Sequence, residues 1–377
     1  MTRVLLAPDK FKGSLTAAEV ARHLATGIRT RRPDVDIVTV PVADGGDGLL
    51  DAVLSAGFDR VAVDAVDALG RPVRTSYARR GSDAIVELAA ICGLAQLAGA
   101  RAPMTATSRG VGQVLAAALD DGCTHVVIGI GGSASTDGGA GLVQALGARV
   151  LGADGYDIGD GGGPLRGVAT LDLSALRRRL RDVRDVRLEV AVDVDNPLTG
   201  PHGAAAVYGP QKGASAEQVR ELDAALTRWA DVVADAVGTD HRGDRGAGAA
   251  GGVGFAAVAA LDARLRPGVE LVLELVGFTE QLAGACLVVT GEGSIDAQTL
   301  NGKTPVGVAT AAQKAGVPVV AVAGRCLLDE AQTKEAGFDA VYTLLAEASS
   351  EREAFTHPDT LLHRIGARIA DRLDDFA

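Results

Sequence analysis

The sequence contains few aromatic residues, no run of basic residues and no apolar stretch long enough to cross a membrane. Aromatic side chains make up 3% of the 377 residues, which argues against the stacking surfaces that bind single-stranded nucleic acid. Lys and Arg total 37 and Asp and Glu total 48, so the net charge is −11. Because nucleic acids and anionic membranes bind clustered positive charge, we expect neither as a partner.

The sequence also lacks the cysteine and histidine patterns of metal sites and disulfide frameworks. No C-x-x-C pair and no histidine at metal-ligand spacing accompanies the four cysteines, which are Cys92, Cys123, Cys286 and Cys326. Scattered cysteines of this kind are typical of reduced thiols in the cytosol. The N-terminus reaches Asp9 after one short apolar run, without the apolar region of a signal peptide, so we expect a cytoplasmic protein.

Glycine is abundant, with 49 residues, or about 13% of the chain against an average near 7%. Many of these glycines stand in short clusters beside Ser, Thr and Asp. Without a Cβ atom the backbone can approach a ligand closely, so these clusters are candidate binding loops.

The two ends of the chain alternate short apolar runs with helical patterns. An apolar strand at 4–7 precedes a capping box, Thr16 to Glu19, and a helix that Pro33 ends. The C-terminal part repeats the alternation, with strands predicted at 286–290, 317–323 and 340–345. Such alternation predicts a parallel sheet covered by helices on both faces.

The middle of the chain is less regular. Short extended runs within 60–87 predict an antiparallel or mixed sheet, and further strands are predicted at 125–130 and 187–193. We therefore predict an α/β protein of two domains. A Rossmann/flavodoxin-like parallel-sheet domain would be built from residues 1–60 and 285–377, and a mixed α/β domain, residues 61–284, would be inserted into it.

A glycine-rich segment, Gly129–Gly139, joins an apolar strand to a helix that we expect to begin near Asp137. Backbone N–H groups and the helix dipole at such a junction suit a phosphate or a carboxylate. The alternative is a tight turn that needs glycine for packing alone. We favour ligand binding because the turn adds side-chain ligands, which are Ser133, Ser135, Thr136 and Asp137.

Two other glycine motifs are weaker signals. Gly246–Gly251 has the spacing G-x-G-x-x-G but follows a polar stretch, so a ligand-contacting surface loop or plain helix packing is the better interpretation. Gly302 and Lys303 resemble the end of a phosphate-binding P-loop, but Ala297 stands where that loop needs a glycine.

Acidic residues stand at predicted strand ends. Asp193 and Asp195 are spaced to share one strand face, as Mg²⁺ ligands or a general base would, and Asp44 and Asp47 form a similar pair; ordinary turn chemistry is the alternative in both cases. Other charged residues also follow strands, where open parallel sheets bind ligands. They are Glu292 and Asp296, and Lys10 and Lys12, whose positive charge is notable in so acidic a chain.

Seven blocks of sequence, in this order, resemble the bacterial glycerate kinases of the type-1 family. The resemblance runs from Val4 to about Leu345 and rests on residues 7–16, 43–48, 129–139, 193–198, 209–213, 246–252 and 290–296. It implies ATP-dependent, Mg²⁺-assisted phosphorylation of D-glycerate, with 2-phosphoglycerate favoured over 3-phosphoglycerate, and an active site in the cleft between two domains. It leaves a homodimer open.

Three positions depart from the pattern of the family. Val192 stands where Cys is expected, Thr136 replaces an expected Asn, and Ser294 replaces a usual Lys or Arg after Gly-Glu-Gly. The third departure removes a basic residue that would contact phosphate.

The resemblance and the residues together assign roles. Asp193 and Asp195 are expected to hold Mg²⁺ or take the hydroxyl proton, with Lys10 as a third catalytic residue, although these roles could be exchanged. Arg325 is a candidate for the substrate carboxylate. The remaining substrate- or phosphate-binding candidates are Lys12, Asp44, Asp47, Gly131, Gly132, Ser133, Ser135, Asp137, Asn196, Lys212, Glu292 and Asp296.

Two other functions remain as alternatives. An NAD(P)-dependent 2-hydroxy-acid oxidoreductase would use the fingerprint at Gly129, but no acidic residue ends a second strand about 20 residues later to bind the ribose. A non-catalytic sugar-acid sensor of the same fold would have lost its metal carboxylates, whereas Asp44, Asp193 and Asp195 are all present.

Overall fold

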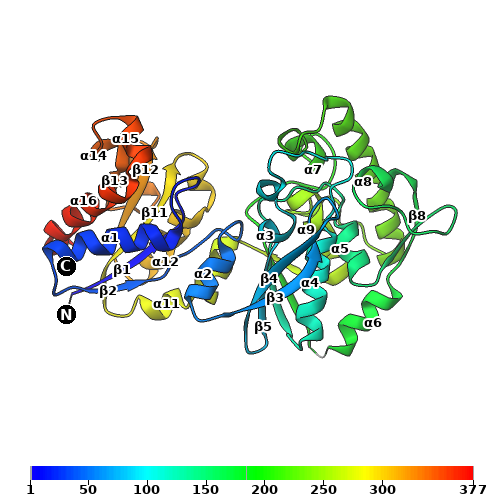
Figure 1. The fold of residues 1–377 in the computed structure, drawn as a ribbon, viewed down its shortest axis with the longest axis horizontal. Helices are drawn as coiled ribbons and strands as arrows, with labels where there is room; N and C mark the ends of the chain where they lie inside the picture. Colours follow the sequence, from blue (N-terminus) through cyan, green and yellow to red (C-terminus); the bar gives the residue numbers. More distant parts are fainter. Residues whose placement is uncertain (1, 184, 377) are drawn as a thin grey trace. The chain divides into compact units, whose positions relative to one another are not determined.

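The computed structural model describes residues 2–183 and 185–376, and these form two compact units. The terminal unit consists of the chain up to Asp44, Asp51–Ala56 and the chain from Val269 onward. The inserted unit consists of Gly45–Leu50 and Gly57–Gly268. Each unit has its own sheet, as Figure 1 shows, so the chain folds as two α/β bodies.

The terminal unit contains a five-stranded parallel sheet. Its order is β13-β12-β11-β1-β2, with bounds Ala340–Thr343, Val319–Cys326, Ala285–Ile295, Arg3–Pro8 and Asp36–Thr39. Leu6 of β1 lies opposite Val289 of β11, and Val289 lies opposite Val320 of β12. All three side chains are buried, as expected for strands covered on both faces. The predicted parallel sheet from the two ends of the chain is therefore confirmed.

Helices cover this sheet because its strands are apolar on both faces. Val4 and Leu6 pack in one cluster with α1 (Ala17–Arg31) and α16 (Pro358–Asp371), while α12 (Thr304–Lys314) also contacts β1, β11 and β12. The predicted capping box opens α1. Smaller helices complete the unit: α10 (Gly268–Leu275), α11 (Phe278–Gln281), α13 (Glu330–Glu335), α14 (Leu344–Glu347) and α15 (Glu351–Thr356).

Helices α1 and α16 lie side by side, as Figure 1 shows, because glycine lets their backbones touch. A Cβ atom on Gly27 would lie 2.1 Å from the carbonyl oxygen of His363, and one on Gly366 would lie 2.4 Å from that of Leu24. Any larger side chain at either position would force the two helices apart.

The inserted unit contains a six-stranded mixed sheet in the order β10-β9-β6-β5-β4-β3. The bounds in that order are Arg264–Arg266, Arg187–Ala191, His125–Gly129, Asp83–Glu87, Pro72–Arg80 and Asp59–Val66. Strands β10, β9, β6 and β5 are parallel, whereas β4 pairs antiparallel with both β5 and β3. A short hairpin-like pair, β7 (Arg149–Gly152) and β8 (Val168–Asp172), lies apart from this sheet. The predicted mixed sheet of the inserted domain is confirmed.

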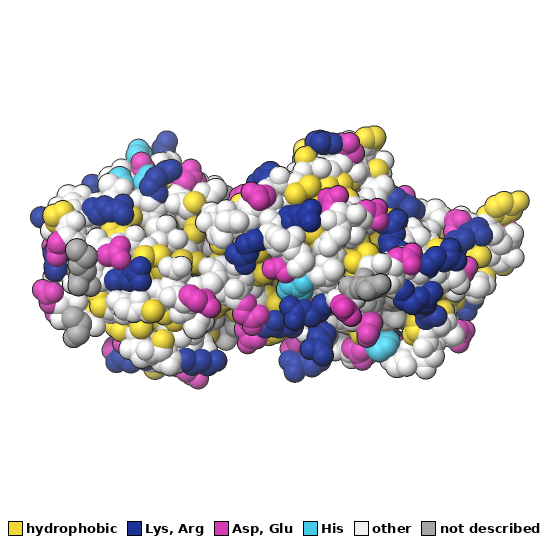
Figure 2. Space-filling model, turned by 90° about the horizontal axis from the view of Figure 1, so that it is seen from below, with side chains coloured by type: hydrophobic (Ala, Val, Ile, Leu, Met, Phe, Trp, Pro, Cys, Tyr) yellow, Lys and Arg dark blue, Asp and Glu magenta, His cyan; other side chains and the backbone are white. Residues whose placement is uncertain are grey.

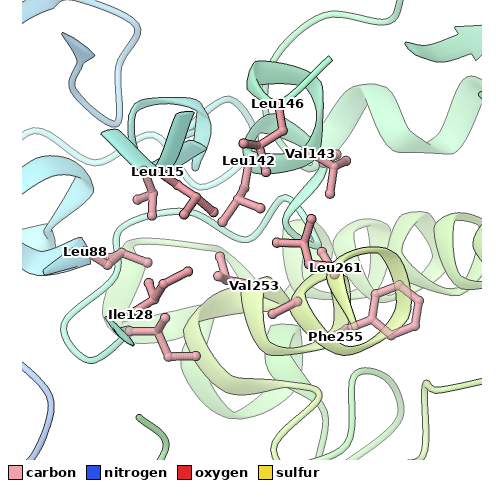
Figure 3. Packing of buried hydrophobic residues seen from close by; sticks show 14 of the residues in the cluster. Leu88, Leu115, Ile128, Leu142, Val143, Leu146, Val253, Phe255 and Leu261 are labelled. Atoms are coloured by element: carbon pink, nitrogen blue, oxygen red, sulfur yellow. The ribbon is translucent and has the colours of Figure 1, made fainter. Parts of the chain in front are cut away.

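In the described part of the chain, nine α-helices lie wholly or partly in this unit. They are α2 (Leu49–Ser55), which crosses into the terminal unit, α3 (Leu88–Cys92), α4 (Arg109–Asp120), α5 (Ala140–Ala145), α6 (Ser174–Asp182), α7 (Ala204–Tyr208), α8 (Ala216–Val237), α9 (Val253–Leu261) and the first residue of α10. Figure 3 shows the core that α4, α5, α9 and β6 share, with Leu115, Ile128, Leu142, Val253 and Leu261 gathered between them.

Two local predictions for this unit are wrong. Strand β9 ends at Ala191, so Asp193 and Asp195 lie in the loop that follows and not on one strand face. Helix α5 begins at Ala140, three residues after the predicted start at Asp137. Among the described residues no helix is long and apolar enough to span a bilayer.

Candidate active site

The predicted residues fall into two groups, one at the carboxyl edge of each sheet's parallel strands. The terminal unit holds Lys10, Lys12, Asp44, Glu292, Asp296 and Arg325. The inserted unit holds Asp47, Gly131, Gly132, Ser133, Ser135, Asp137, Asp193, Asp195, Asn196 and Lys212. Carboxyl edges are where open parallel sheets bind ligands, and each group is considered by itself.

At the edge of the terminal sheet, Asp9 is a charged residue to which the sequence motifs assigned no role. Its Oδ1 atom accepts from the Lys10 N–H at 2.6 Å, and its Oδ2 atom accepts from the Thr304 hydroxyl at 2.8 Å. Burial, reinforced by the negative charge of Asp44, raises the pKa of Asp9 to about 7. Its position directly after β1 and inside the sequence block 7–16 could have marked it.

Glu292, on β11, is a second carboxylate with an altered proton affinity. The Thr299 hydroxyl donates to its Oε1 atom at 2.5 Å. Burial raises the pKa of Glu292, Asp296 and Asp44 raise it further, and the Thr299 hydrogen bond and the charge of Lys303 oppose the shift. Asp9 is therefore a carboxyl group that can hold a proton near neutral pH, and the charge of Asp44 acts on both Asp9 and Glu292.

Asp296 lies in the turn after β11. Its carboxylate accepts from the Gln298 N–H at 2.9 Å, and its own N–H donates to the Thr299 hydroxyl at 3.0 Å. These contacts are the turn chemistry that was the alternative for several acidic residues of this chain. They also place Thr299 where it can bond Glu292.

Positive charge adjoins these acidic residues. Lys12 is exposed, and among the described residues no carboxylate lies within 4 Å of its ammonium group. A Cβ atom on Gly293 would lie 3.4 Å from the Lys12 backbone nitrogen, so the Lys12 segment lies against the end of β11. Arg325, on β12, is exposed and donates its Nε–H to the Ser294 hydroxyl at 3.1 Å.

In the inserted unit, the turn that follows β6 packs backbone against backbone. The Ala134 N–H donates to the carbonyl of Cys92 at 3.0 Å, and the Leu94 N–H donates to the carbonyl of Gly132 at 2.9 Å. A Cβ atom on Gly131 would lie 2.7 Å from Cα of Gly46. Gly132 has φ +73°, a left-handed conformation that favours glycine. Packing alone thus accounts for these two glycines.

Asp137, the charged residue of this turn, is buried. Asp137 has no exposed surface, and its carboxylate accepts from Ser108 N–H at 2.7 Å, Ser108 Oγ–H at 2.8 Å, Gly139 N–H at 3.2 Å and Gly141 N–H at 3.3 Å. Burial raises its pKa against these bonds. Asp137 therefore caps the first turn of α5, and ligand binding at this helix terminus stays a prediction.

The side chain of Lys212 forms hydrogen bonds with the same turn. It is 2% exposed, and its ammonium donates to the Ser133 hydroxyl at 2.8 Å and to the Ser135 carbonyl at 2.6 Å. Burial lowers the pKa of Lys212 to about 7, while the charge of Asp137 opposes that shift. The hydroxyls of Ser135 and Thr136 are buried without a hydrogen-bond partner in the described part of the chain.

The loop after β9 gives its three predicted site residues protein partners. Asp193 Oδ1 accepts from the Gly268 N–H at 2.9 Å. Asp195 pairs with Arg245 at 2.6 Å, and both side chains are largely exposed, at 70% and 83%. The Asn196 amide donates to the carbonyl of His202 and accepts from the Tyr208 hydroxyl at 2.6 Å. The sequence offered no basic neighbour for Asp195, since Arg245 is distant along the chain.

The glycine-rich segment that precedes α9 is part of this packing. Gly251 has φ +70°, and a Cβ atom there would lie 2.1 Å from the carbonyl oxygen of Ser135. The Gly138 N–H donates to the carbonyl of Gly251 at 2.9 Å. Of the two interpretations of Gly246–Gly251, the geometry favours packing over a ligand-contacting surface loop. Asp47, by contrast, is exposed, and Gly45 beside it packs on Ala191.

A resident metal site is not formed by these side chains. Among the described residues, no three His, Cys, Asp or Glu side chains converge as metal ligands. Asp193 and Asp195 stay predicted Mg²⁺ ligands, in the lesser arrangement in which one or two carboxylates hold the ion together with substrate phosphates. On the face seen in Figure 2, acidic and basic side chains lie next to one another over much of the surface.

The carboxyl ends of parallel strands bind ligands in α/β proteins, and exposed cations beside a carboxyl group with a pKa of about 7 suit an enzyme that acts on anionic small molecules. The chain belongs to the glycerate kinase family, which comprises ATP-dependent phosphotransferases: the model of the family matches residues 4–374. This confirms the resemblance seen in the sequence blocks and contradicts the oxidoreductase alternative.

Individual relatives agree with the family. The chain is 44% identical to a glycerate kinase of Bacillus subtilis strain 168 over 372 residues, which cover 98% of this chain and 97% of the relative. It is 43% identical to a glycerate 2-kinase of Escherichia coli K12 over 376 residues, 98% of each chain. A crystal structure from Salmonella typhimurium LT2, assigned as glycerate kinase 2, matches with a TM-score of 0.86 and 42% identity, covering 99% of this chain and 98% of that one.

Proposed function

We propose that this protein transfers the γ-phosphate of ATP to the 2-hydroxyl of D-glycerate, with Mg²⁺, and releases 2-phosphoglycerate and ADP. The observation that carries the proposal is the match of the glycerate kinase family over residues 4–374. The choice of the 2-hydroxyl is supported by the Escherichia coli relative named glycerate 2-kinase, which matches over 98% of both chains.

The residues of the terminal unit suit the handling of charge and protons in this reaction. Lys10 and Lys12 follow β1 and would neutralise the anionic groups of the substrates. Asp9 would accept the proton of the attacking hydroxyl, since a carboxyl group with a pKa of about 7 is half ionised at neutral pH. Phosphoryl transfer needs little more than such positioning and neutralisation of charge.

The inserted unit would hold the metal that accompanies ATP. Asp193 and Asp195 would be its carboxylate ligands, and bound there the ion would neutralise the charge of the transferring phosphate. Asp195 must first leave Arg245, and an exposed pair of this kind is worth only about 0.2–1 kcal/mol. The Gly131–Ser135 segment and Asn196 would line the substrate, held in shape by Lys212 and Asp137.

The test is a coupled assay for ADP with D-glycerate, with and without Mg²⁺, followed by identification of the product with enolase. Enolase converts 2-phosphoglycerate but not 3-phosphoglycerate, so formation of an absorbing enol product supports the proposal in full. ADP release without an enolase substrate would overturn the 2-hydroxyl assignment alone. Binding of D-glycerate without ADP release would favour the non-catalytic sensor and overturn the kinase proposal.

A further inference from the structure

The strand pair β11–β12 brings Ser294 and Arg325 together at the edge of the terminal sheet. The parallel register places Ser294 directly opposite Arg325. The Nε–H of Arg325 donates to the Ser294 hydroxyl at 3.1 Å, so the guanidinium is in direct contact with the Ser294 side chain. In strands, residues two apart share a face, and Glu292 therefore lies on the same face as Ser294.

Arg325 has the properties of a ligand-binding arginine. It is exposed in a chain of net charge −11, yet among the described residues no carboxylate lies within ion-pair distance of it. Glu292, the nearest acidic residue along the paired strand, is instead bonded to Thr299. The two terminal nitrogens of a guanidinium form a planar fork that matches a phosphate or carboxylate, and the bond from Nε to Ser294 orients that fork.

The same pairing explains the serine. A basic side chain at position 294 would stand directly opposite Arg325, and like charges in directly opposed positions of a strand pair repel. Ser294 is short, uncharged and able to accept from Nε, so it accommodates Arg325. The departure from a basic residue after Gly-Glu-Gly and the arginine on the neighbouring strand are thus two parts of one arrangement.

We propose that Arg325, oriented by Ser294, binds an oxyanion of the reacting substrates. The oxyanion is a phosphate of ATP or the carboxylate of glycerate. The inference rests on the proposed kinase function and names a binding residue and a positioning residue for it.

The test compares four variants by steady-state kinetics with Mg²⁺-ATP and D-glycerate varied separately. Arg325→Ser should raise the KM of one substrate by about 10-fold or more, as loss of a charge-assisted hydrogen bond requires. An effect on the KM of ATP assigns a phosphate, and an effect on the KM of glycerate assigns the carboxylate. Ser294→Ala should raise the same KM by a few fold, because it only loosens the fork.

The decisive variant is the exchange Ser294→Arg combined with Arg325→Ser, which places the cation on the other strand of the pair. It should recover most of the affinity that Arg325→Ser loses. Arg352→Ser, an exposed arginine of α15 in the same unit, is the matched control and should leave both KM values unchanged.

Three results would overturn the inference while leaving the kinase function intact. They are wild-type KM values for both substrates in Arg325→Ser, an equal change in Arg352→Ser, or no recovery in a folded exchange variant. Circular dichroism and thermal unfolding establish that each variant is folded. Absence of ADP release by the wild-type protein itself would instead overturn the proposed function, so the two failures are distinguishable.

Discussion

The two sheet edges use charged residues in opposite ways. At the edge of the terminal unit, Lys12 and Arg325 are exposed and Asp9 titrates near pH 7. At the turn after β6 in the inserted unit, Asp137 and Lys212 are buried, and their charged groups form hydrogen bonds with other groups of the protein. Both edges belong to glycine-rich sequence blocks, so the blocks alone do not distinguish residues that meet a ligand from residues that hold a loop.

The difference follows from how each edge is packed. In the inserted unit, Gly131, Gly138 and Gly251 bring backbones into contact, and the side chains between them are enclosed. In the terminal unit, β11 pairs with β1 as far as Gly291 but continues to Ile295. Glu292 and Ser294 therefore lie beyond the end of the pairing with β1. The side chains of Glu292 and Ser294 on that extension are half-buried and so keep some exposure to solvent.

Removal of the buried carboxylate should have the largest effect. Asp137→Ala would leave the N–H groups of Ser108, Gly139 and Gly141 without their acceptor, and we expect a loss of roughly 3–5 kcal/mol in the free energy of unfolding. Urea denaturation measures this loss. Asp195→Ala, which breaks an exposed pair, is the control and should cost less than about 1 kcal/mol. Equal costs would contradict the contrast between the two kinds of acidic residue.

Asp193→Asn should affect catalysis and leave folding nearly unchanged. The amide oxygen can still accept from the Gly268 N–H, whereas the negative charge proposed to face the metal is lost. We expect turnover to fall by at least about a hundredfold. The measurement is kcat at saturating substrates, beside thermal unfolding of the same preparation. A folded variant with near-normal kcat would remove Asp193 from the site.

Replacing Lys10 or Lys12 tests whether these lysines bind substrate or only face solvent. Lys10→Ala or Lys12→Ala should cost about 1.5–3 kcal/mol in kcat/KM, the worth of a hydrogen bond to a charged group. A lysine that only faces solvent would cost less than about 0.5 kcal/mol. Saturation curves for both substrates give the answer, and wild-type curves from both variants would withdraw the assignment.

The smallest expected effect is a pH dependence of stability. The folded pKa of Asp9 is about 7 and its ordinary value is 3.8, so between these values the folded state keeps a proton that the unfolded state has lost. Stability from this group therefore falls as pH rises through that window. Asp9→Asn removes the effect, and the Tm of the variant minus that of the wild type should increase by a few degrees from pH 5 to pH 8. A difference in Tm that stays constant with pH would show that folding does not raise the pKa of Asp9.

Much of the fold was predictable because its signals are local. Capping boxes at Thr16 and Ser215 depend on side chains three residues apart, and both are present in the structure. The parallel sheets follow from apolar runs that alternate with helical patterns. The end of β9 and the start of α5 were misplaced, because pairing with neighbouring strands and the cap supplied by Asp137 decide those limits.

By itself, the sequence determined the α/β class, the family and the strand ends at which the charged residues stand, since these depend on periodicity and on blocks of adjacent residues. Only the tertiary structure decided which charges are exposed. It paired Asp195 with Arg245, buried Lys212 under Ser133 and set Arg325 beside Ser294. Each of these contacts joins residues far apart in the chain, and their energies depend on burial and distance in space, which no pattern of neighbours along the sequence contains.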